Sequence, residues 1–435
     1  MKKLLTLALT AIAAGNAWAE EPNITVLEGG LMYGGLMPQC ISNNGTYVGG
    51  STFAMPMFMA DWRKQETWIL NEDTGSTYED FGAEIKWTTD DGKGYGFDDN
   101  GAVMIDFNTR EYNVFCPIGK DGVGDAMATS ATEDGTIIVG YVKQGMRPVT
   151  AAYWEDGKIN YLPIPSDKEL GFTTQGESVA RAISNDGKII IGYVYDKLST
   201  YPMVIWTRQD DGSYICDPVC ARYFGEPRSD KEFLKFAPLS ITPDGKTVLM
   251  EVQYNTDSPE LLGENCLAYF DVETEKLDVA YIDGENGIPV GTRLQTLNKS
   301  ISNNGTVVGY YESNEGRGAF IMTRAEMQPK SFYYEFPGID EFYTFYDNGE
   351  NVASSITADG RYITGMGWDT KAGYVGYVLD RGIDDYTGVN VIETETAGSR
   401  EEAIYTIDGR RVNQPVKGIN IIKGTDGKTR KILVK

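Results

Sequence analysis

The stretch between Phe332 and Asp347 holds the densest mixture of aromatic rings and carboxylates in the chain. In a connection between structural repeats, such rings can stack on sugar faces while carboxylates accept hydrogen bonds from sugar hydroxyls. The candidate ligand-binding residues are therefore Tyr334, Glu335, Tyr343 and Tyr346. The alternative needs no ligand, because the stretch would then be the fourth strand of a repeat followed by a packed connection. We favour this second interpretation.

Catalytic motifs are missing from the sequence, and it identifies no catalytic residue. Histidine is absent, which removes the commonest general base and zinc ligand and excludes triad hydrolysis. Residues 184–187 lack the spacing and the tryptophan of a sialidase Asp box, and the sequence has no phosphate-binding loop, EF-hand loop or Cys-x-x-Cys pair. Hydrolysis by two carboxylates that converge from distant loops stays open, because the chain has 63 acidic residues.

Three acidic clusters, Glu72-Asp73, Asp90-Asp91 and Asp98-Asp99-Asn100, are the candidates for ion binding. Their oxygen atoms suit Ca²⁺, yet none has the spacing of a known calcium loop, so solvated turns are the favoured interpretation. We expect no cofactor and no metal site, with calcium as the alternative. The five cysteines are too few and too scattered for a disulfide framework, although Cys216 and Cys220 are close enough in sequence to pair.

The formal net charge of −24 over 435 residues limits the partners of this protein. Such a charge repels phosphate backbones and anionic lipids, so binding to nucleic acid or to a membrane surface is disfavoured. Hydrophobic residues make up 41% of the chain, which is enough to bury a sizeable core. The 50 glycines and 27 tyrosines fit a chain of many short strands joined by tight turns.

A five-residue block, an apolar or small residue and Ser/Thr-x-Asx-Gly, occurs seven times in the middle of the chain. Asn-Gly or Asp-Gly supplies the positive φ angles of a tight hairpin turn, and the hydroxyl can bind the turn backbone. Consecutive block glycines are 43 to 60 residues apart, which accommodates one four-stranded blade per repeat. The copies are residues 41–45, 88–92, 131–135, 183–187, 241–245, 301–305 and 356–360.

Three strand-like runs follow most of the turns, so the repeat unit is turn, strand, strand, strand. The second of these runs, which is the third strand of the blade, carries Trp or Phe in several repeats, and we attribute these rings to packing between blades. Repeat seven is short of strands, whereas residues 23–27 are an orphan strand whose pairing with the seventh blade would close a ring. We predict an all-β, seven-bladed β-propeller over residues 20–382. A six-bladed or two-sheet arrangement is the alternative, because repeat two is degenerate.

The repeat unit resembles the HAF repeats of predicted extracellular proteins, in which a small-residue-Ile-Asn-x-x-Gly-x-Val-Val-Gly block precedes an Ala-Phe-x-Trp strand. Residues 301–309 followed by Ala319-Phe320 are the copy most similar to that pattern. The resemblance implies an extracellular, β-propeller-like protein and assigns no activity.

The first 19 residues have the order of a secretory signal peptide. Lys2 and Lys3 precede an apolar run over residues 4–14, and Ala17-Trp18-Ala19 supplies the small residues of a cleavage site. The run is too short to span a bilayer, and no later apolar segment reaches that length, so we expect no transmembrane segment in the mature chain. We expect cleavage after Ala19 and export through the periplasm to the cell surface or the medium.

Residues 383–435 are predicted to form a linker and a small β-sandwich-like module of short antiparallel strands. The module resembles the type A C-terminal sorting domain of the type IX secretion system of Bacteroidetes. The resemblance implies recognition by the secretion machinery, with removal of the module and attachment to surface glycolipid as further expectations. The matching residues are Tyr405, Gly409, Arg410, Val412, Gly418, Ile419, Ile421, Lys431, Val434 and Lys435.

These patterns together predict a secreted or cell-surface propeller that binds glycan or protein partners without catalysis. Two alternatives stay open, a carboxylate-dependent enzyme acting on polysaccharide and a structural surface component. A cleft with two carboxylates at glycosidase spacing would favour the enzyme, whereas a shallow aromatic face would favour binding.

Overall fold

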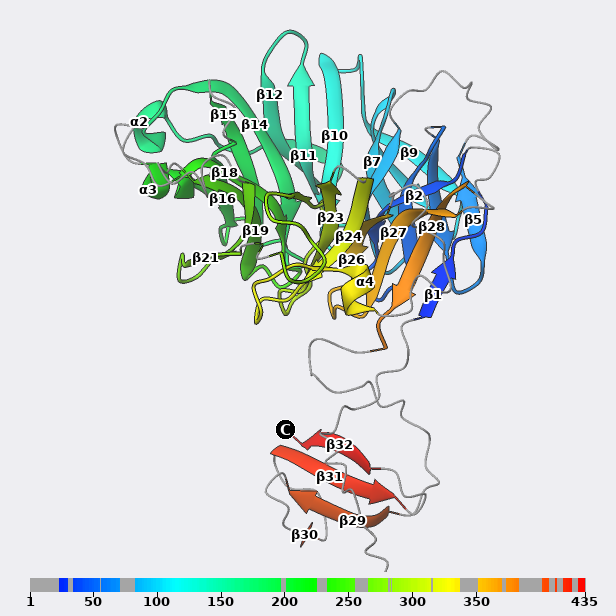
Figure 1. Ribbon diagram of the computed structural model, residues 1–435. Coiled ribbons are helices and arrows are strands. Elements are labelled where there is room, and N and C mark those ends of the chain that lie inside the picture. Colours follow the sequence, from blue (N-terminus) through cyan, green and yellow to red (C-terminus); the bar gives the residue numbers. More distant parts are fainter. Residues whose placement is uncertain are drawn as a thin grey trace, which may run out of the picture. The chain divides into compact units, whose positions relative to one another are not determined.

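Seven four-stranded antiparallel sheets form the blades of a β-propeller in this protein (Figure 1). The computed structural model describes residues 23–29, 34–54, 56–70, 83–196, 201–224, 233–254, 265–280, 282, 284–313, 316–336, 351–369, 373–382, 401–406, 411–412, 418–424 and 429–434. The chain divides into two compact units, and the propeller is the unit Pro22–Arg381. The predicted seven-bladed β-propeller is thereby confirmed.

Blades 1 to 4 are each built from four strands that are consecutive in sequence. Blade 1 consists of β2 (Leu36–Ile41), β3 (Tyr47–Thr52), β4 (Met57–Asp61) and β5 (Glu66–Ile69). Blade 2 consists of β6 (Glu84–Thr88), β7 (Lys93–Asp98), β8 (Gly101–Asp106) and β9 (Glu111–Pro117). Blade 3 consists of β10 (Val123–Ala131), β11 (Ile137–Gln144), β12 (Val149–Glu155) and β13 (Lys158–Tyr161). Blade 4 consists of β14 (Thr174–Ile183), β15 (Ile189–Asp196), β16 (Met203–Arg208) and β17 (Tyr214–Asp217).

Blades 5 and 6 follow the same order, and blade 7 combines strands from both ends of the propeller sequence. Blade 5 consists of β18 (Phe233–Ile241), β19 (Thr247–Tyr254), β20 (Asn265–Asp271) and β21 (Leu277–Val279). Blade 6 consists of β22 (Arg293–Gln295), β23 (Val307–Ser313), β24 (Gly316–Met322) and β25 (Lys330–Ser331). Blade 7 consists of β26 (Asn351–Ile356), β27 (Tyr362–Asp369), β28 (Gly373–Asp380) and β1 (Asn23–Val26).

Strand β1 closes the ring as the sequence predicts. It pairs antiparallel with β28, and the register sets Asn23 opposite Asp380 and Val26 opposite Tyr377. Beyond the strand, the Leu27 amide donates to the Gly376 carbonyl at 2.9 Å. The seventh blade thus receives its fourth strand from the start of the chain.

All seven sequence blocks form the hairpin between the first and second strands of a blade, as predicted. Their glycines have positive φ angles between 66° and 87°. In blade 4 the Ser184 Oγ donates to Asp186 Oδ1 at 2.7 Å and accepts from the Ile189 amide at 3.1 Å. The hydroxyl therefore ties the turn to the start of the second strand, which explains why each block carries Ser or Thr.

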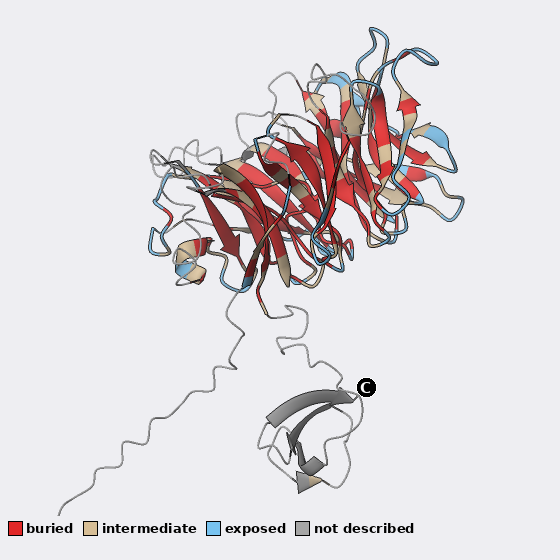
Figure 2. Cartoon of the chain, turned by 90° about the vertical axis from the view of Figure 1, so that its right-hand side faces the viewer, coloured by how far each residue is buried: buried red, intermediate tan, exposed pale blue. Residues whose placement is uncertain are grey.

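The core lies between neighbouring blades, with buried residues along the strands and exposed residues in many of the hairpins (Figure 2). Trp154, Trp206, Phe270 and Phe320, in the third strands, are at most 4% exposed. One apolar cluster joins residues of blades 3, 4 and 5, including Trp206 and Phe270. The prediction that the third-strand rings pack between blades is confirmed.

Short helices interrupt the connections between blades at α2 (Asp167–Leu170), α3 (Val219–Phe224) and α4 (Phe332–Glu335). The interpretation of residues 332–336 as a fourth strand is wrong, because β25 ends at Ser331 and α4 begins at once. The Ser331 Oγ accepts a hydrogen bond from the Tyr334 amide at 3.3 Å, which caps the helix N-terminus. The cap turns the chain away from the sheet.

The alternation of strand direction divides the propeller into two faces. The hairpins between first and second strands and between third and fourth strands lie on one side, which we call the turn face. The hairpins between second and third strands and the connections between blades lie on the other side, which we call the loop face. Helices α2, α3 and α4 all follow a fourth strand and so belong to the loop face.

The C-terminal unit contains one antiparallel sheet with the order β30-β29-β31-β32. Its strands are β29 (Glu401–Thr406), β30 (Arg411–Val412), β31 (Gly418–Gly424) and β32 (Thr429–Val434). Tyr405 lies in β29, Val412 in β30, Gly418, Ile419 and Ile421 in β31, and Lys431 and Val434 in β32. Gly409, Arg410 and Lys435 lie outside the described residues, and a sandwich arrangement stays a prediction.

Candidate functional site

The first strands of the blades surround the propeller axis. Strand β2 contacts both β6 and β26, and β10 contacts both β6 and β14. Six of the seven first strands carry a β-bulge at the same place, two residues before the block. A bulge re-aims the side chain of its extra residue. These residues are Gln39, Lys86, Thr129, Arg181, Leu239 and Ser354.

Blade 6 has a larger irregularity here, since Gln295 pairs with Tyr310 and Ile301 with Val307, which leaves three extra residues on the first strand. From this insertion two polar residues extend across the axis. The Asn298 amide nitrogen donates to the Thr129 carbonyl in blade 3 at 3.1 Å, and Lys299 Nζ donates to the Thr88 carbonyl in blade 2 at 3.3 Å. Lys299 is 2% exposed and its ammonium lies 4.5 Å from the Trp87 ring centroid. We call Asn298 and Lys299 the axial plug, because they join blades that are not neighbours.

Acidic side chains of the turn face compensate the charge of the plug. Glu133 accepts from the Asp90 amide at 2.5 Å and from the Asn43 side chain, so one carboxylate joins the turns of blades 1, 2 and 3. Burial lowers the pKa of Lys299, and Glu133 opposes that shift. Burial raises the pKa of Glu133 to about 7, and Lys299 opposes that shift in turn. The turn side of the axis therefore holds a partly buried network in which Glu133 and Lys299 stabilise each other's charge.

The loop face carries a different constellation, which begins with three tyrosines of blade 4. Tyr193 and Tyr195 are near the loop-face end of β15, and Tyr201 belongs to the connection that follows. The ring centroids are 5.2 Å apart for Tyr193–Tyr195 and Tyr193–Tyr201, and 5.7 Å apart for Tyr195–Tyr201. All three are partly exposed.

Charged side chains of blades 5 and 6 continue this cluster. Lys235 Nζ lies 5.7 Å from the Tyr201 ring centroid and 2.6 Å from Glu251 Oε2. The other Glu251 oxygen is 3.8 Å from Arg293 in blade 6. Since β18 and β22 run from the loop face toward the turn face, Lys235 and Arg293 lie at the loop-face ends of their strands.

Tyr310 and Arg317 complete the constellation in blade 6. The Tyr310 hydroxyl donates to Gln295 Oε1 at 2.7 Å, and the Arg317 guanidinium lies 5.6 Å from the Tyr310 ring centroid. We call the whole set the loop-face arc. Its members are Tyr193, Tyr195, Tyr201, Lys235, Glu251, Arg293, Tyr310 and Arg317.

The arc offers aromatic rings, hydrogen-bond donors and hydrogen-bond acceptors. Its one carboxylate, that of Glu251, is in an ion pair. Tyrosine hydroxyls both donate and accept, lysine and arginine donate, and a carboxylate accepts. Lys235 binds Glu251 and Arg293 lies close to it, so this carboxylate is held as an ion pair. A set of partly exposed rings with such groups suits a polyhydroxylated ligand.

The predicted ligand residues are only partly placed by the structure. Tyr334, on α4, is 55% exposed. Glu335 is partly exposed and lies 3.5 Å from Lys330 Nζ. Tyr343 and Tyr346 lie outside the described residues. The described part of the stretch therefore offers one exposed ring, whereas Phe332 and Phe336 are buried in the core of blades 6 and 7.

Metal and cysteine chemistry receive no support within the described part of the chain. There, no three Asp, Glu or Cys side chains come together as a metal-binding group. All five cysteines are free, including Cys216 and Cys220. Burial raises the pKa of the Cys220 thiol to about 12, so the thiol is protonated near neutral pH and a poor nucleophile.

Sequence reasoning missed both the axial plug and the arc. Lys299 is two residues ahead of a block, at the position of the bulge residues, where Lys86 and Arg181 are also basic. Aligning the blades at this position would have shown basic residues near the axis of an acidic protein. Tyr193 and Tyr195 alternate on one strand, which indicates a shared face, but no sequence signal joins them to Lys235 or Tyr310.

Comparison with known proteins shows the fold. No protein-family model and no curated protein match this sequence. An oligogalacturonate lyase in complex with manganese matches with a TM-score of 0.51 and 14% identity, over 82% of this chain and 92% of the lyase. A puromycin-hydrolysing peptidase of Mycobacterium tuberculosis matches with a TM-score of 0.51 and 12% identity, over 89% of this chain and 57% of the peptidase.

TolB from Acinetobacter baumannii matches at 14% identity with a TM-score of 0.40, over 67% of this chain and 62% of TolB. The match thus spans less than two thirds of TolB and of the peptidase. At these identities the likeness concerns the β-propeller fold alone.

Proposed function

We propose that this protein is an exported β-propeller that binds a glycan on the loop-face arc without chemical turnover. The observation that carries the proposal is the continuous set of rings and polar groups from Tyr193 in blade 4 to Arg317 in blade 6. Connections of variable length frame this face, and ligand sites are commonly built on such connections. A protein partner is the other outcome of the test.

Binding is favoured over polysaccharide cleavage because of the state of the carboxylates in the arc. General acid–base cleavage needs an acid and a base that are free to exchange protons with substrate. Glu251 is 9% exposed and held by Lys235, and Arg317 lies 3.4 Å from Glu312. The lyase match supports the fold and adds no residue correspondence to this alternative.

A glycan array and thermal-shift screen of the chain from Glu20 onward, with calcium and with chelator, tests the proposal. We expect one glycan class to stabilise the protein, and Tyr201→Ala to weaken its binding roughly tenfold, as expected for a lost stacking contact. Tyr161→Ala is the matched control, because Tyr161 is 42% exposed on β13 and outside the arc. Equal affinity of Tyr201→Ala and wild type would contradict a site on the arc.

The proposal of export depends on the signal-peptide-like first 19 residues and on the C-terminal module. We propose that the type IX secretion system performs the final step. The motif residues Tyr405, Ile419 and Lys431 lie on three strands of one sheet, β29, β31 and β32, which gives a receptor a folded element to recognise. No helix within the described residues has the length and hydropathy needed to cross a membrane. A chain ending at residue 400 should accumulate in the periplasm of a host with this system; its normal appearance at the surface would refute the assignment.

A further inference from the structure

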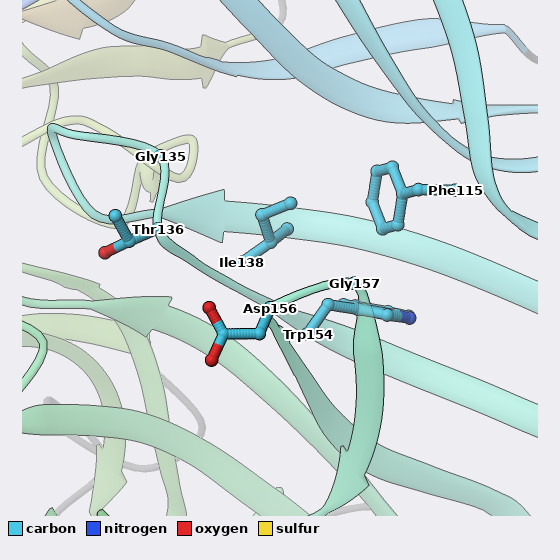
Figure 3. Close-up of a pocket in the computed structure, with 7 residues that line it drawn as sticks. All are labelled: Phe115, Gly135, Thr136, Ile138, Trp154, Asp156 and Gly157. Carbon is cyan, nitrogen blue, oxygen red and sulfur yellow. The ribbon is translucent and has the colours of Figure 1, made fainter.

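A cleft opens on the turn face between blades 2 and 3, on the opposite face to the loop-face arc. Its volume is about 290 Å³, enough for one side chain or one ring. Phe115 of β9 and Trp154 of β12 form an aromatic side of the cleft, where the two rings contact each other edge to face with centroids 5.2 Å apart, and Ile138 lies beside them (Figure 3). Asp156 and Thr136, from two hairpins of blade 3, supply the polar side chains of the cleft.

The turn beside this cleft departs from a charge pattern that the other six blades keep. Where the block ends in Asp-Gly, a basic residue follows the glycine; where it ends in Asn-Gly, Thr follows. Lys188 Nζ lies 2.9 Å from Asp186 Oδ2, and Lys246 Nζ lies 2.9 Å from Asp244 Oδ2. The acidic turns of blades 2, 4 and 5 therefore carry their own counter-charge, whereas Arg361 of blade 7 forms its ion pair with Asp380.

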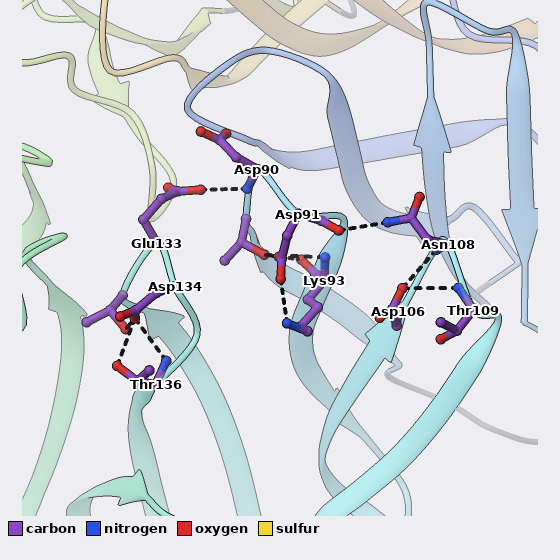
Figure 4. A network of polar contacts seen from close by, with 11 residues as sticks. Asp90, Asp91, Lys93, Asp106, Asn108, Thr109, Glu133, Asp134 and Thr136 are labelled. Atoms are coloured by element: carbon purple, nitrogen blue, oxygen red, sulfur yellow. Dashed lines mark hydrogen bonds and ion pairs between the residues drawn. The ribbon is translucent and has the colours of Figure 1, made fainter.

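Blade 3 has the acid without the base. Its block reads Glu133-Asp134-Gly135, and Thr136 stands where the other acidic turns have Lys or Arg. Asp134 Oδ1 accepts from the Thr136 amide at 3.0 Å and hydroxyl at 2.8 Å, whereas Lys93 binds Asp91 in blade 2 (Figure 4). Hydrogen bonding from Thr132 lowers the pKa of Asp134, so the carboxylate stays ionised.

The surroundings add negative charge. A Cβ at Gly135, which lines the cleft, would collide with the Tyr95 hydroxyl. Burial, followed by the charges of Asp91, Asp134, Asp106 and Glu133, raises the pKa of that tyrosine. Among the described residues, neither Asp134 nor Asp156 forms an ion pair. The cleft thus combines aromatic rings with the carboxylate of Asp156 in its lining, and the Asp134 carboxylate lies on the adjoining turn.

We propose that this cleft binds the guanidinium group of an arginine side chain on a protein partner. A planar guanidinium stacks on aromatic rings and pairs with carboxylates, and it only donates hydrogen bonds. The side-chain acceptors here are the Asp156 carboxylate and the Thr136 oxygen, and the Thr136 proton is already donated to Asp134. A sugar would need several donors as well as acceptors, and among the lining side chains the Trp154 indole N–H is the one donor that is not already used. The net charge of −24 attracts basic partners over longer distances.

The test is a titration of the chain from Glu20 onward with the capped peptide Gly-Gly-Arg-Gly-Gly, following the Trp154 indole N–H by NMR. Trp154→Phe identifies that signal. We expect the arginine peptide to shift it saturably, and the same peptide with citrulline, which is neutral, to leave it unchanged. Raising the salt concentration should weaken binding, since the contact is exposed and ionic.

Two variants test whether the carboxylates of Asp156 and Asp134 bind the arginine peptide. Asp156→Asn keeps the turn, because Asn tolerates the φ of 52° found there, and should weaken binding roughly fivefold. Thr136→Lys supplies the base that blades 2, 4 and 5 carry and should weaken binding at least as much by occupying Asp134. Asp211→Asn, in the corresponding hairpin of blade 4, is the matched control and should leave the affinity unchanged.

An equal response to the citrulline peptide, or unchanged affinity in Asp156→Asn and Thr136→Lys, would overturn the proposal. A neutral oligosaccharide that shifts Trp154 while the arginine peptide does not would overturn it as well. The glycan site is tested separately by Tyr201→Ala, which should bind the arginine peptide like wild type. Failure at one face is therefore distinguishable from failure at the other.

Discussion

The two faces of the propeller are built from the same strands but by opposite means. On the turn face, seven short blocks repeat one hydrogen-bonding scheme, and Lys299 and Glu133 bind across blades at the axis. On the loop face, helices and longer connections separate the blades, and partly exposed tyrosines gather in blades 4 and 6. The turn face, where one scheme repeats, holds the ring together, and the loop face, where the connections vary, is the face on which we place the glycan. The arginine cleft on the turn face lies beside the one acidic turn that lacks a basic residue.

Substituting one lysine on each face should give the largest difference between the faces, in the free energy of unfolding and in glycan affinity. Lys299→Ala should lower the free energy of unfolding by about 3 kcal/mol, because it removes a buried cation and leaves Glu133 without it. Lys235→Ala should cost about 1 kcal/mol, since Lys235 is more exposed, yet it should weaken glycan binding. Urea denaturation and glycan titration of both variants measure the two effects.

The opposite result would break this comparison. A folded Lys299→Ala protein that loses its glycan affinity while keeping its stability would place the ligand at the axis. A Lys235→Ala protein that loses stability and keeps affinity would reduce the arc to a packing element.

Two glycines provide a smaller contrast at matched backbone geometry. Gly135 on the turn face and Gly373 on the loop face have φ angles of 66° and 79°. A Cβ at Gly135 would collide with Tyr95, whereas nothing lies within 4 Å of a Cβ at Gly373. We expect Gly135→Ala to cost about 2 kcal/mol and Gly373→Ala about 1 kcal/mol in thermal unfolding. Equal losses would mean that the turn face is no more tightly packed.

The smallest expected effect concerns the turn face, where Glu133 should make the free energy of unfolding depend on pH. Burial raises the pKa of Glu133 from 4.5 to about 7, so the folded protein retains a proton that the unfolded chain releases in this window. The free energy of unfolding should therefore fall as pH rises from about 4.5 to 7, and stay lower above it. Glu133→Gln should remove roughly 1 kcal/mol of this fall in urea titrations at several pH values. An unchanged slope would assign the dependence to other groups.

The blades were predictable because their turns are local. Asn-Gly and Asp-Gly strongly favour a hairpin when strand-like runs flank them, and seven copies at blade spacing leave few architectures open. The orphan strand at residues 23–27 was also assigned correctly, since a four-stranded seventh blade needed a partner. Residues 332–336 were misassigned because their aromatic content suits a strand, while the helix depends on the single cap at Ser331.

The candidate site was not predictable by the same reasoning. The arc draws on three blades and more than ninety residues of sequence, with Tyr201, Lys235 and Arg293 as examples. These side chains come together only because the blades close into a propeller. The plug depends on a longer insertion between Gln295 and Ile301 in blade 6, and its length could not be read from the spacing of the other blades. The charge exception at Thr136 was visible in the sequence, yet its meaning required the ion pairs of Lys188 and Lys246 for comparison.

The pairing of β1 with β28 sets the order in which this chain completes its fold. Asn23 finds its partner only when Asp380 has been synthesised, and contacts this distant in sequence form slowly. Until then the ring stays open and the chain can be threaded lengthwise through a narrow pore. Once β1 has paired with β28, the first and last strands of the propeller belong to one sheet, and force that pulls these two strands apart acts directly on their hydrogen bonds.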